Sequence, residues 1–86
     1  MSAGQTTPAR RVYPDPAYNG GLTLAEGDYG KDAEGLWWVR PPRCHSGVLD
    51  GHTVTEHEDG TVTVSPSIHS PGEWHGYLEH GVWREV

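Results

Sequence analysis

The stretch Thr61 to Val86, TVTVSPSIHSPGEWHGYLEHGVWREV, has the densest alternation of apolar and polar side chains in this 86-residue chain. A period of two, in residues that are often β-branched or aromatic, predicts strands with one buried face. The Ser-Pro-Ser segment at 65–67 interrupts the pattern, because proline has no N–H to donate within a sheet. We therefore expect a strand before this interruption and an aromatic hairpin after it.

A first hairpin is predicted by the Asp59-Gly60 pair just before this stretch. The length of its loop decides which residues share a face. A three-residue loop at 58–60, with Gly60 left-handed, places Val54 opposite Val64, so that valines line one face and threonines the other. A two-residue loop mixes apolar and polar residues on both faces. The three-residue loop is therefore the prediction.

The same comparison at the C-terminal hairpin favours a three-residue loop at 79–81. In that register Leu78 lies opposite Val82, and the other face stacks Tyr77 against Trp83. The hairpin then has one core face and one aromatic face. Such an arrangement predicts that both faces are covered.

The composition is typical of a small β domain. Hydrophobic residues make up 34% of the chain, phenylalanine is absent, and four tryptophans must supply much of the buried area. Twelve glycines and seven prolines favour turns over helices. We expect an all-β domain over residues 36–86, a small antiparallel meander that forms a sandwich or an open barrel. The expected strands are 36–40, 44–49, 52–57, 61–65, 74–79 and 82–86, and 68–72 is expected to connect the fourth strand to the fifth.

Residues 1–35 are expected to form an extended N-terminal arm. The segment has three prolines and only scattered apolar positions, and its Pro-x-Pro spacing beside Tyr13 and Tyr18 favours a polyproline-like strip. Because such a segment has few means of ordering itself, it is either a disordered tail or an arm that lies along a neighbouring subunit.

Aromatic residues are the candidates for a protein-protein interface. Trp37 and Trp38 are adjacent, so on a strand they point to opposite faces, and we expect one in the core and the other on a second surface. Tryptophan and tyrosine anchor many protein interfaces. A module that stacks sugars on some of the same rings is the competing hypothesis. The candidate interface residues are Tyr13, Tyr18, Trp37, Trp38, Tyr77 and Trp83.

Six histidines and one cysteine raise the question of a zinc site, because structural zinc takes four such ligands. The spacing offers no Cys-x-x-Cys pair and no His-x-x-x-His pair. Cys44 and His45 are adjacent, so on a strand they point apart. We expect no cofactor. If zinc binds, the candidate ligands are Cys44, His52 and His75.

Other functional classes are disfavoured. Twelve acidic against six basic residues give a net charge of −6, which opposes nucleic-acid binding because phosphate contacts need a basic surface. No apolar run approaches the roughly 20 residues that span a bilayer, and the first residues lack the apolar segment of a signal peptide. Ser65, Ser67 and Ser70 lack a surrounding glycine elbow. We expect no nucleic-acid partner, no membrane partner and no enzymatic activity.

The pattern of residues 61–86 resembles a family of small proteins, common in phages and prophages, that is described only as a domain of unknown function. The similarity covers about residues 36–86, and its most specific parts are VSPSI at 64–68 and WHG at 74–76. Many members carry cysteines suggestive of metal. Here a Cys-x-x-Cys is missing, and Trp74 precedes His75 where a cysteine is expected. The resemblance implies a phage origin.

These observations predict a non-enzymatic phage protein that acts through protein-protein contacts, as a minor or decorating component of the virion capsid. The expected partners are other phage structural proteins, including the major capsid protein, within a larger assembly. The expected localisation is the virion, after synthesis in the host cytoplasm. The alternatives are a small intracellular zinc-binding or host-interaction module and the sugar-binding module.

Overall fold

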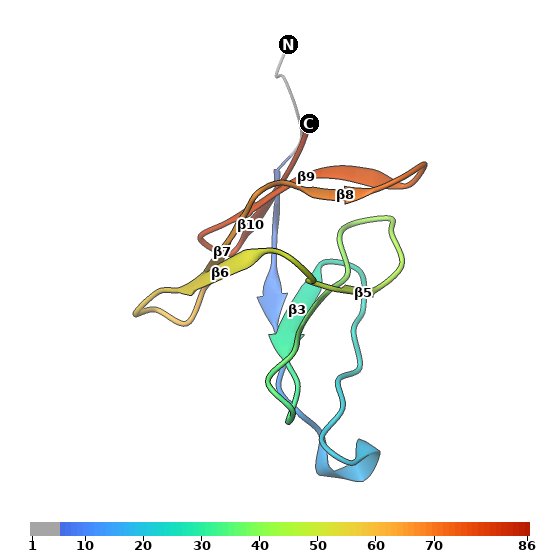
Figure 1. The fold of residues 1–86 in the computed structure, drawn as a ribbon, viewed down its shortest axis with the longest axis vertical. Coiled ribbons are helices and arrows are strands. Elements are labelled where there is room, and N and C mark those ends of the chain that lie inside the picture. The colour runs from blue at the N-terminus through green and yellow to red at the C-terminus, as the bar shows by residue number, and fades with distance from the viewer. Residues whose placement is uncertain (1–5) are drawn as a thin grey trace.

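The structure is a computed structural model that describes residues 6–86, and within them the chain is all-β, as predicted. Two four-stranded sheets and a two-stranded hairpin pack together without closing into a barrel (Figure 1). One sheet has the order β1 (Thr6–Pro8), β10 (Val82–Glu85), β9 (Trp74–Glu79) and β8 (Ile68–Ser70). The second has the order β2 (Arg10–Arg11), β3 (Asp28–Lys31), β4 (Trp37–Val39) and β5 (Gly47–Val48). The hairpin joins β6 (Thr53–Glu56) to β7 (Val62–Ser65), and Pro16–Tyr18 forms a single 3-10 turn, η1.

Most of the expected strands are present. The expected strand 74–79 coincides with β9, and 36–40, 52–57, 61–65 and 82–86 contain β4, β6, β7 and β10. Only two residues of the expected strand 44–49 pair, as β5. The segment 68–72 was expected to be a connection, but its first three residues form β8, antiparallel to β9 with His69 opposite His75. The strand β8 has only three residues and pairs with β9 across the short turn 71–73, so its own sequence gives little sign of it.

The β6–β7 hairpin has the predicted register. Val54 lies opposite Val64, and Thr55 lies opposite Thr63. Gly60 has a φ of 89°, so the loop ends on the left-handed residue that this turn requires. Val62 and Val64 are almost fully buried. Burial of a single valine face therefore selected the register, as expected.

The predicted register of the β9–β10 hairpin is wrong by one residue. Its turn has two residues, His80 and Gly81, with φ values of 47° and 73°. Positive φ at both positions is the signature of a type I′ turn, whose twist matches that of the flanking strands. Trp83 consequently lies opposite Leu78 and turns into the core, because a one-residue slip moves every side chain to the other face. The predicted stack of Trp83 on Tyr77 does not form.

The core lies between the sheets and centres on Leu78 and Trp83, which are 0% and 1% exposed. Trp74 meets Trp83 edge to face, with ring centroids 5.5 Å apart, a favourable geometry for aromatic pairs. The strand β7 packs against β9 and brings its two buried valines to this cluster. Tyr29, from the second sheet, is 2% exposed and belongs to the same core.

The described part of the N-terminal segment is paired with strands of its own chain. The strand β1 runs antiparallel to β10, and β2 runs parallel to β3. The expected boundary at residue 35 falls between β3 and β4, which are neighbours in one sheet. Backbone pairing and polar contacts hold this segment, and neither leaves an apolar pattern in the sequence. The expected contact of residues 1–5 with a neighbour lies outside the described residues.

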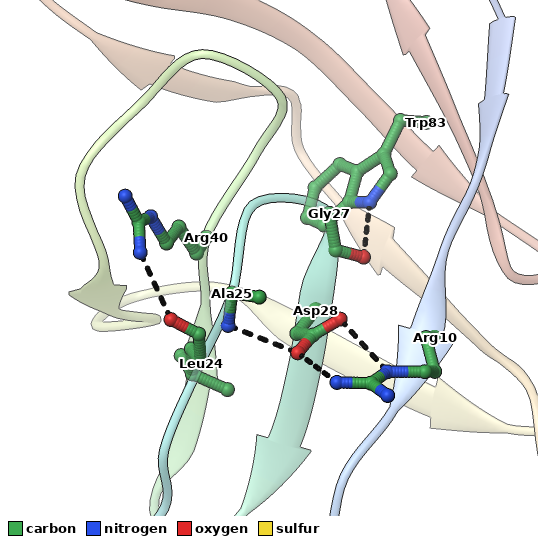
Figure 2. A network of polar contacts seen from close by, with 7 residues as sticks. All are labelled: Arg10, Leu24, Ala25, Gly27, Asp28, Arg40 and Trp83. Atoms are coloured by element: carbon green, nitrogen blue, oxygen red, sulfur yellow. Dashed lines mark hydrogen bonds and ion pairs between the residues drawn. The ribbon is translucent and has the colours of Figure 1, made fainter.

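A buried carboxylate fixes β2 to β3. Asp28 is 3% exposed; its Oδ1 accepts a hydrogen bond from Arg10 Nε at 3.2 Å, and its Oδ2 accepts from Arg10 Nη2 at 2.8 Å and the Ala25 N–H at 2.9 Å (Figure 2). Burial alone raises the pKa of Asp28. The hydrogen bonds from Arg10 and Ala25, with the charges of Arg10 and Arg40, outweigh burial, so this pKa lies below its ordinary value. Beside it, the Trp83 indole donates to the Gly27 carbonyl at 2.8 Å.

Candidate functional site

The strand β4 places two tryptophans on opposite faces of the second sheet. Trp37 lies opposite Lys31 and packs against the core cluster, whereas Trp38 lies opposite Gly30 on the other face. The structure confirms that the two rings point to opposite faces, but both are half-buried, and Trp37 packs against the core cluster without belonging to it. Each tryptophan has its own set of polar neighbours, so the sheet presents two distinct candidate surfaces.

The first surface, which we call the aromatic patch, consists of Arg11, Tyr13, Lys31 and Trp37. The guanidinium carbon of Arg11 lies 5.3 Å from the Tyr13 ring centroid and 5.1 Å from that of Trp37. The Lys31 ammonium lies 5.4 Å from the Trp37 centroid. These distances are within the range of cation–π attraction. Arg11 therefore links the two rings, and Tyr13 keeps 67% of its surface exposed.

Acidic and backbone groups hold the cations of the patch in place. Arg11 Nη1 donates to Glu56 Oε2 and to the Gly60 carbonyl, both at 3.1 Å. The Lys31 ammonium lies 3.6 Å from Glu56 Oε1. The β6–β7 hairpin thus supports the patch from one side. These contacts restrain the Arg11 guanidinium at the position where it meets the Tyr13 and Trp37 rings.

The second surface is a groove of about 300 Å³ on the Trp38 face. Trp38 Nε1 donates to Asp32 Oδ2 at 2.9 Å. The other carboxylate oxygen, Oδ1, accepts the N–H groups of Glu34 and Leu36, both at 2.9 Å. The Leu36 N–H and then the Trp38 indole hold the pKa of Asp32 below its ordinary value, so the carboxylate is ionised at neutral pH. The groove is lined by Gly21, Leu22, Leu24, Asp32, Trp38 and Ser46.

The remaining predicted interface aromatics do not join these surfaces. Tyr18 is 63% exposed and lies in η1. Tyr77 lies on the outer face of β9, where the Arg84 guanidinium carbon is 4.4 Å from its ring centroid. Trp83 is in the core and has no exposed face to offer a partner. Of the six candidates, the structure brings together Tyr13 and Trp37.

The candidate zinc ligands are divided between two environments. Cys44 and His52 line a cleft of about 220 Å³ between the 41–52 segment and β8. His75 Nε2 lies 3.2 Å from the Ser67 hydroxyl on β9's outer side. Across residues 6–86, no three histidine, cysteine or acidic side chains are arranged to hold a metal ion. Burial raises the pKa of the Cys44 thiol, which keeps it protonated and weakly nucleophilic.

Two residues that matter at these surfaces were not identified from the sequence. Asp32 begins the turn Asp-Ala-Glu-Gly at 32–35, and an aspartate at that position commonly accepts hydrogen bonds from the backbone of its own turn. That signal was present in the sequence, although the contact with Trp38 was not evident from it. The residues around Arg11 in the sequence do not indicate its contact with Trp37, because that contact depends on the parallel pairing of β2 with β3.

Comparison with protein-family models, with curated proteins and with solved structures finds no match for this chain. Within residues 6–86 there is also no helix with the length and apolar character needed to cross a membrane.

Proposed function

We propose that the protein is a non-enzymatic binding module that uses the aromatic patch to hold another protein. The observation that carries this proposal is the convergence of Tyr13 and Trp37 on the guanidinium of Arg11. Tyrosine, tryptophan and arginine are the residue types that most often dominate the binding energy of protein interfaces. Here three of them, contributed by two separated segments, form one surface.

The order within the patch supports the same proposal. A side chain that is already fixed before binding loses less conformational entropy when a partner covers it. Arg11 is fixed by Glu56 and by the Gly60 carbonyl, and its contact with Tyr13 restrains an otherwise exposed ring. The patch is therefore suited to bind without a large ordering cost. Enzymatic catalysis plays no part in this role.

The setting that we propose for this binding is a phage particle. The resemblance of residues 36–86 to a phage and prophage family supports a minor or decorating component of the virion, held by other phage structural proteins such as the major capsid protein. The strands β1 and β2 pair with β10 and β3 of their own chain. We therefore place the contact with the particle on side chains of the patch, and not on the backbone of an extended arm.

Incorporation into particles tests the proposal. The tagged chain is produced in a host that assembles the phage, and its amount in gradient-purified particles is measured by quantitative mass spectrometry. We expect Tyr13→Ala to lower incorporation by about tenfold, the effect of losing a contact worth about 1.4 kcal/mol. Tyr18→Ala is the matched control, because Tyr18 is similarly exposed but lies outside the patch. It should incorporate like the unchanged chain.

Two results would contradict the proposal in different ways. Absence of the unchanged chain from purified particles would refute the virion assignment. Incorporation that falls equally for Tyr13→Ala and Tyr18→Ala, or for neither, would refute the assignment of the contact to the patch. Circular dichroism of each variant establishes that the fold is retained, which is expected because both tyrosines are largely exposed.

A further inference from the structure

The Trp38 groove lies on the face of β4 opposite the aromatic patch, so it is a separate candidate site. Two leucines, Leu22 and Leu24, and the Trp38 ring give it an apolar lining. Asp32 supplies an ionised carboxylate, and Ser46 an exposed hydroxyl. Apolar walls with a few placed polar groups are the usual composition of a ligand site.

The hydrogen bonds of Asp32 leave part of the carboxylate available. Oδ1 accepts two backbone N–H groups, whereas Oδ2 accepts only the Trp38 indole N–H. A carboxylate oxygen has room for two donors. No lysine, arginine or histidine among residues 6–86 forms an ion pair with Asp32. The groove therefore holds a negative charge that lacks an internal counter-charge in the described chain.

A long cationic side chain matches this arrangement. Its aliphatic stem packs on apolar side chains while its charged head group reaches a carboxylate. The head group is also attracted to the face of an indole ring. The same chain shows this preference on the other face of the strand, where Arg11 and Lys31 lie over Trp37.

We propose that the Trp38 groove binds an arginine or lysine side chain of a protein partner. The net charge of the chain, −6 from twelve acidic and six basic residues, attracts a basic partner and speeds its approach. The same charge repels acidic side chains and phosphate groups, which also have no cation to meet in the groove. This inference does not depend on the aromatic patch, because it uses the opposite face of β4.

The test uses the intact chain labelled with ¹⁵N and a blocked pentapeptide, acetyl-Gly-Gly-Arg-Gly-Gly-amide, as the probe. We expect a saturable shift of the Trp38 indole N–H signal, with a Kd of about 5 mM at low salt, in the range of one ion pair with a cation–π contact. The matched control peptide carries citrulline in place of arginine, which keeps the shape and removes the charge. It should bind at least tenfold more weakly.

Two variants locate the site. Ser46→Lys places a positive charge at the exposed edge of the groove without altering Asp32 or Trp38, and we expect it to weaken binding at least fivefold. Thr55→Lys makes the same change in net charge at an exposed position of β6, away from the groove lining, and its Kd should stay within twofold. Asp32→Asn keeps an oxygen acceptor for the turn and removes the charge, so it should also weaken binding at least fivefold.

Several outcomes would overturn the inference. The Trp38 signal could fail to shift up to 50 mM peptide. The citrulline peptide could bind as tightly as the arginine peptide, or Ser46→Lys could bind the arginine peptide as tightly as the unchanged chain does. Equal weakening by Ser46→Lys and Thr55→Lys would likewise overturn it, since the attraction would then arise from overall charge and not from the groove.

Discussion

Replacing Trp83 with phenylalanine tests whether a buried hydrogen bond ties the N-terminal segment to the core. Trp83 is 1% exposed, and its indole donates to the Gly27 carbonyl at 2.8 Å. Phenylalanine removes this donor and fills less space. The Gly27 carbonyl still accepts a hydrogen bond from the Arg10 N–H at 3.1 Å. The lost hydrogen bond costs about 1 kcal/mol, and the lost packing about 1 to 2 kcal/mol. We expect the free energy of unfolding to fall by about 2 to 3 kcal/mol.

The chain offers a matched control in Trp74. This residue is 3% exposed and forms the other half of the same edge-to-face pair. Its indole N–H has no hydrogen-bond partner among the described residues. Trp74→Phe therefore loses similar packing but also removes a buried unpaired donor, whose burial costs about 1 to 3 kcal/mol. We expect the net change in the free energy of unfolding to lie between a loss of about 1 kcal/mol and a gain of about 2 kcal/mol.

Urea unfolding followed by circular dichroism measures both variants. For a domain of this size, total stability is about 4 to 13 kcal/mol, so the loss in Trp83→Phe is readily detected. Thermal unfolding should show a decrease of about 4 to 8 °C for each kcal/mol lost. Equal destabilisation by the two variants, or a larger loss in Trp74→Phe, would refute the reasoning, because the hydrogen bond would then contribute nothing beyond packing.

Three further predictions follow from single positions. Gly76→Ala should destabilise the protein by several kcal/mol in the same urea assay, because the added Cβ would clash with the backbone carbonyl of Arg84 in the neighbouring strand; a change below about 1 kcal/mol would contradict this geometry. The lowered pKa of Asp28 means that its contribution to stability is complete above about pH 5 and is lost as pH falls through its folded-state pKa, below the ordinary value of about 3.9. Asp28→Asn should therefore flatten the dependence of unfolding free energy on pH between about 5 and 2, and an unchanged slope would count against the buried ion pair. Cys44, buried and with a raised pKa, should react with a disulfide reagent at pH 7.5 at least roughly tenfold more slowly than in urea, whereas equal rates would show that the thiol is accessible.

The two hairpins show when register is readable from sequence. In β6–β7 one face carries valines and the other threonines, so only one register buries the apolar face, and the prediction was correct. In β9–β10 both alternative registers bury apolar or aromatic side chains, and pattern alone does not separate them. The conformation of His80 and Gly81 decides the register, and histidine is not a residue that marks a type I′ turn.

The N-terminal strands were missed for a different reason. The strands β1 and β2 are short, and their partners lie far away in the sequence. This segment is attached to the rest of the chain by the backbone pairing of β1 with β10, by the ion pairs of Arg11 and Lys31 with Glu56, and by the indole contact of Trp83 with Gly27. The periodicity of a short segment indicates whether one of its faces is apolar, but it does not indicate which distant strand the segment pairs with. The Pro- and Gly-rich composition therefore predicted an arm, whereas β1 and β2 in the described part of the segment pair with strands of their own chain.

The candidate surfaces were predictable in part. Tyr13 and Trp37 were identified as interface aromatics by residue type, but their convergence depends on Arg11, which the parallel β2–β3 pairing brings between them. The opposite directions of Trp37 and Trp38 followed from strand geometry. The contact of the Asp32 carboxylate with Trp38 could not be predicted from strand geometry, because the turn that joins β3 to β4 brings Asp32 to the indole.

Site-specific photo-crosslinking in assembled particles tests most directly the claim that the protein works through its aromatic patch. A benzophenone amino acid replaces Tyr13 in one variant and Tyr18 in another, and crosslinked products from purified particles are identified by mass spectrometry. We predict that position 13 crosslinks to a phage structural protein and that position 18 does not. Efficient crosslinking from position 18 with none from position 13 would contradict the account.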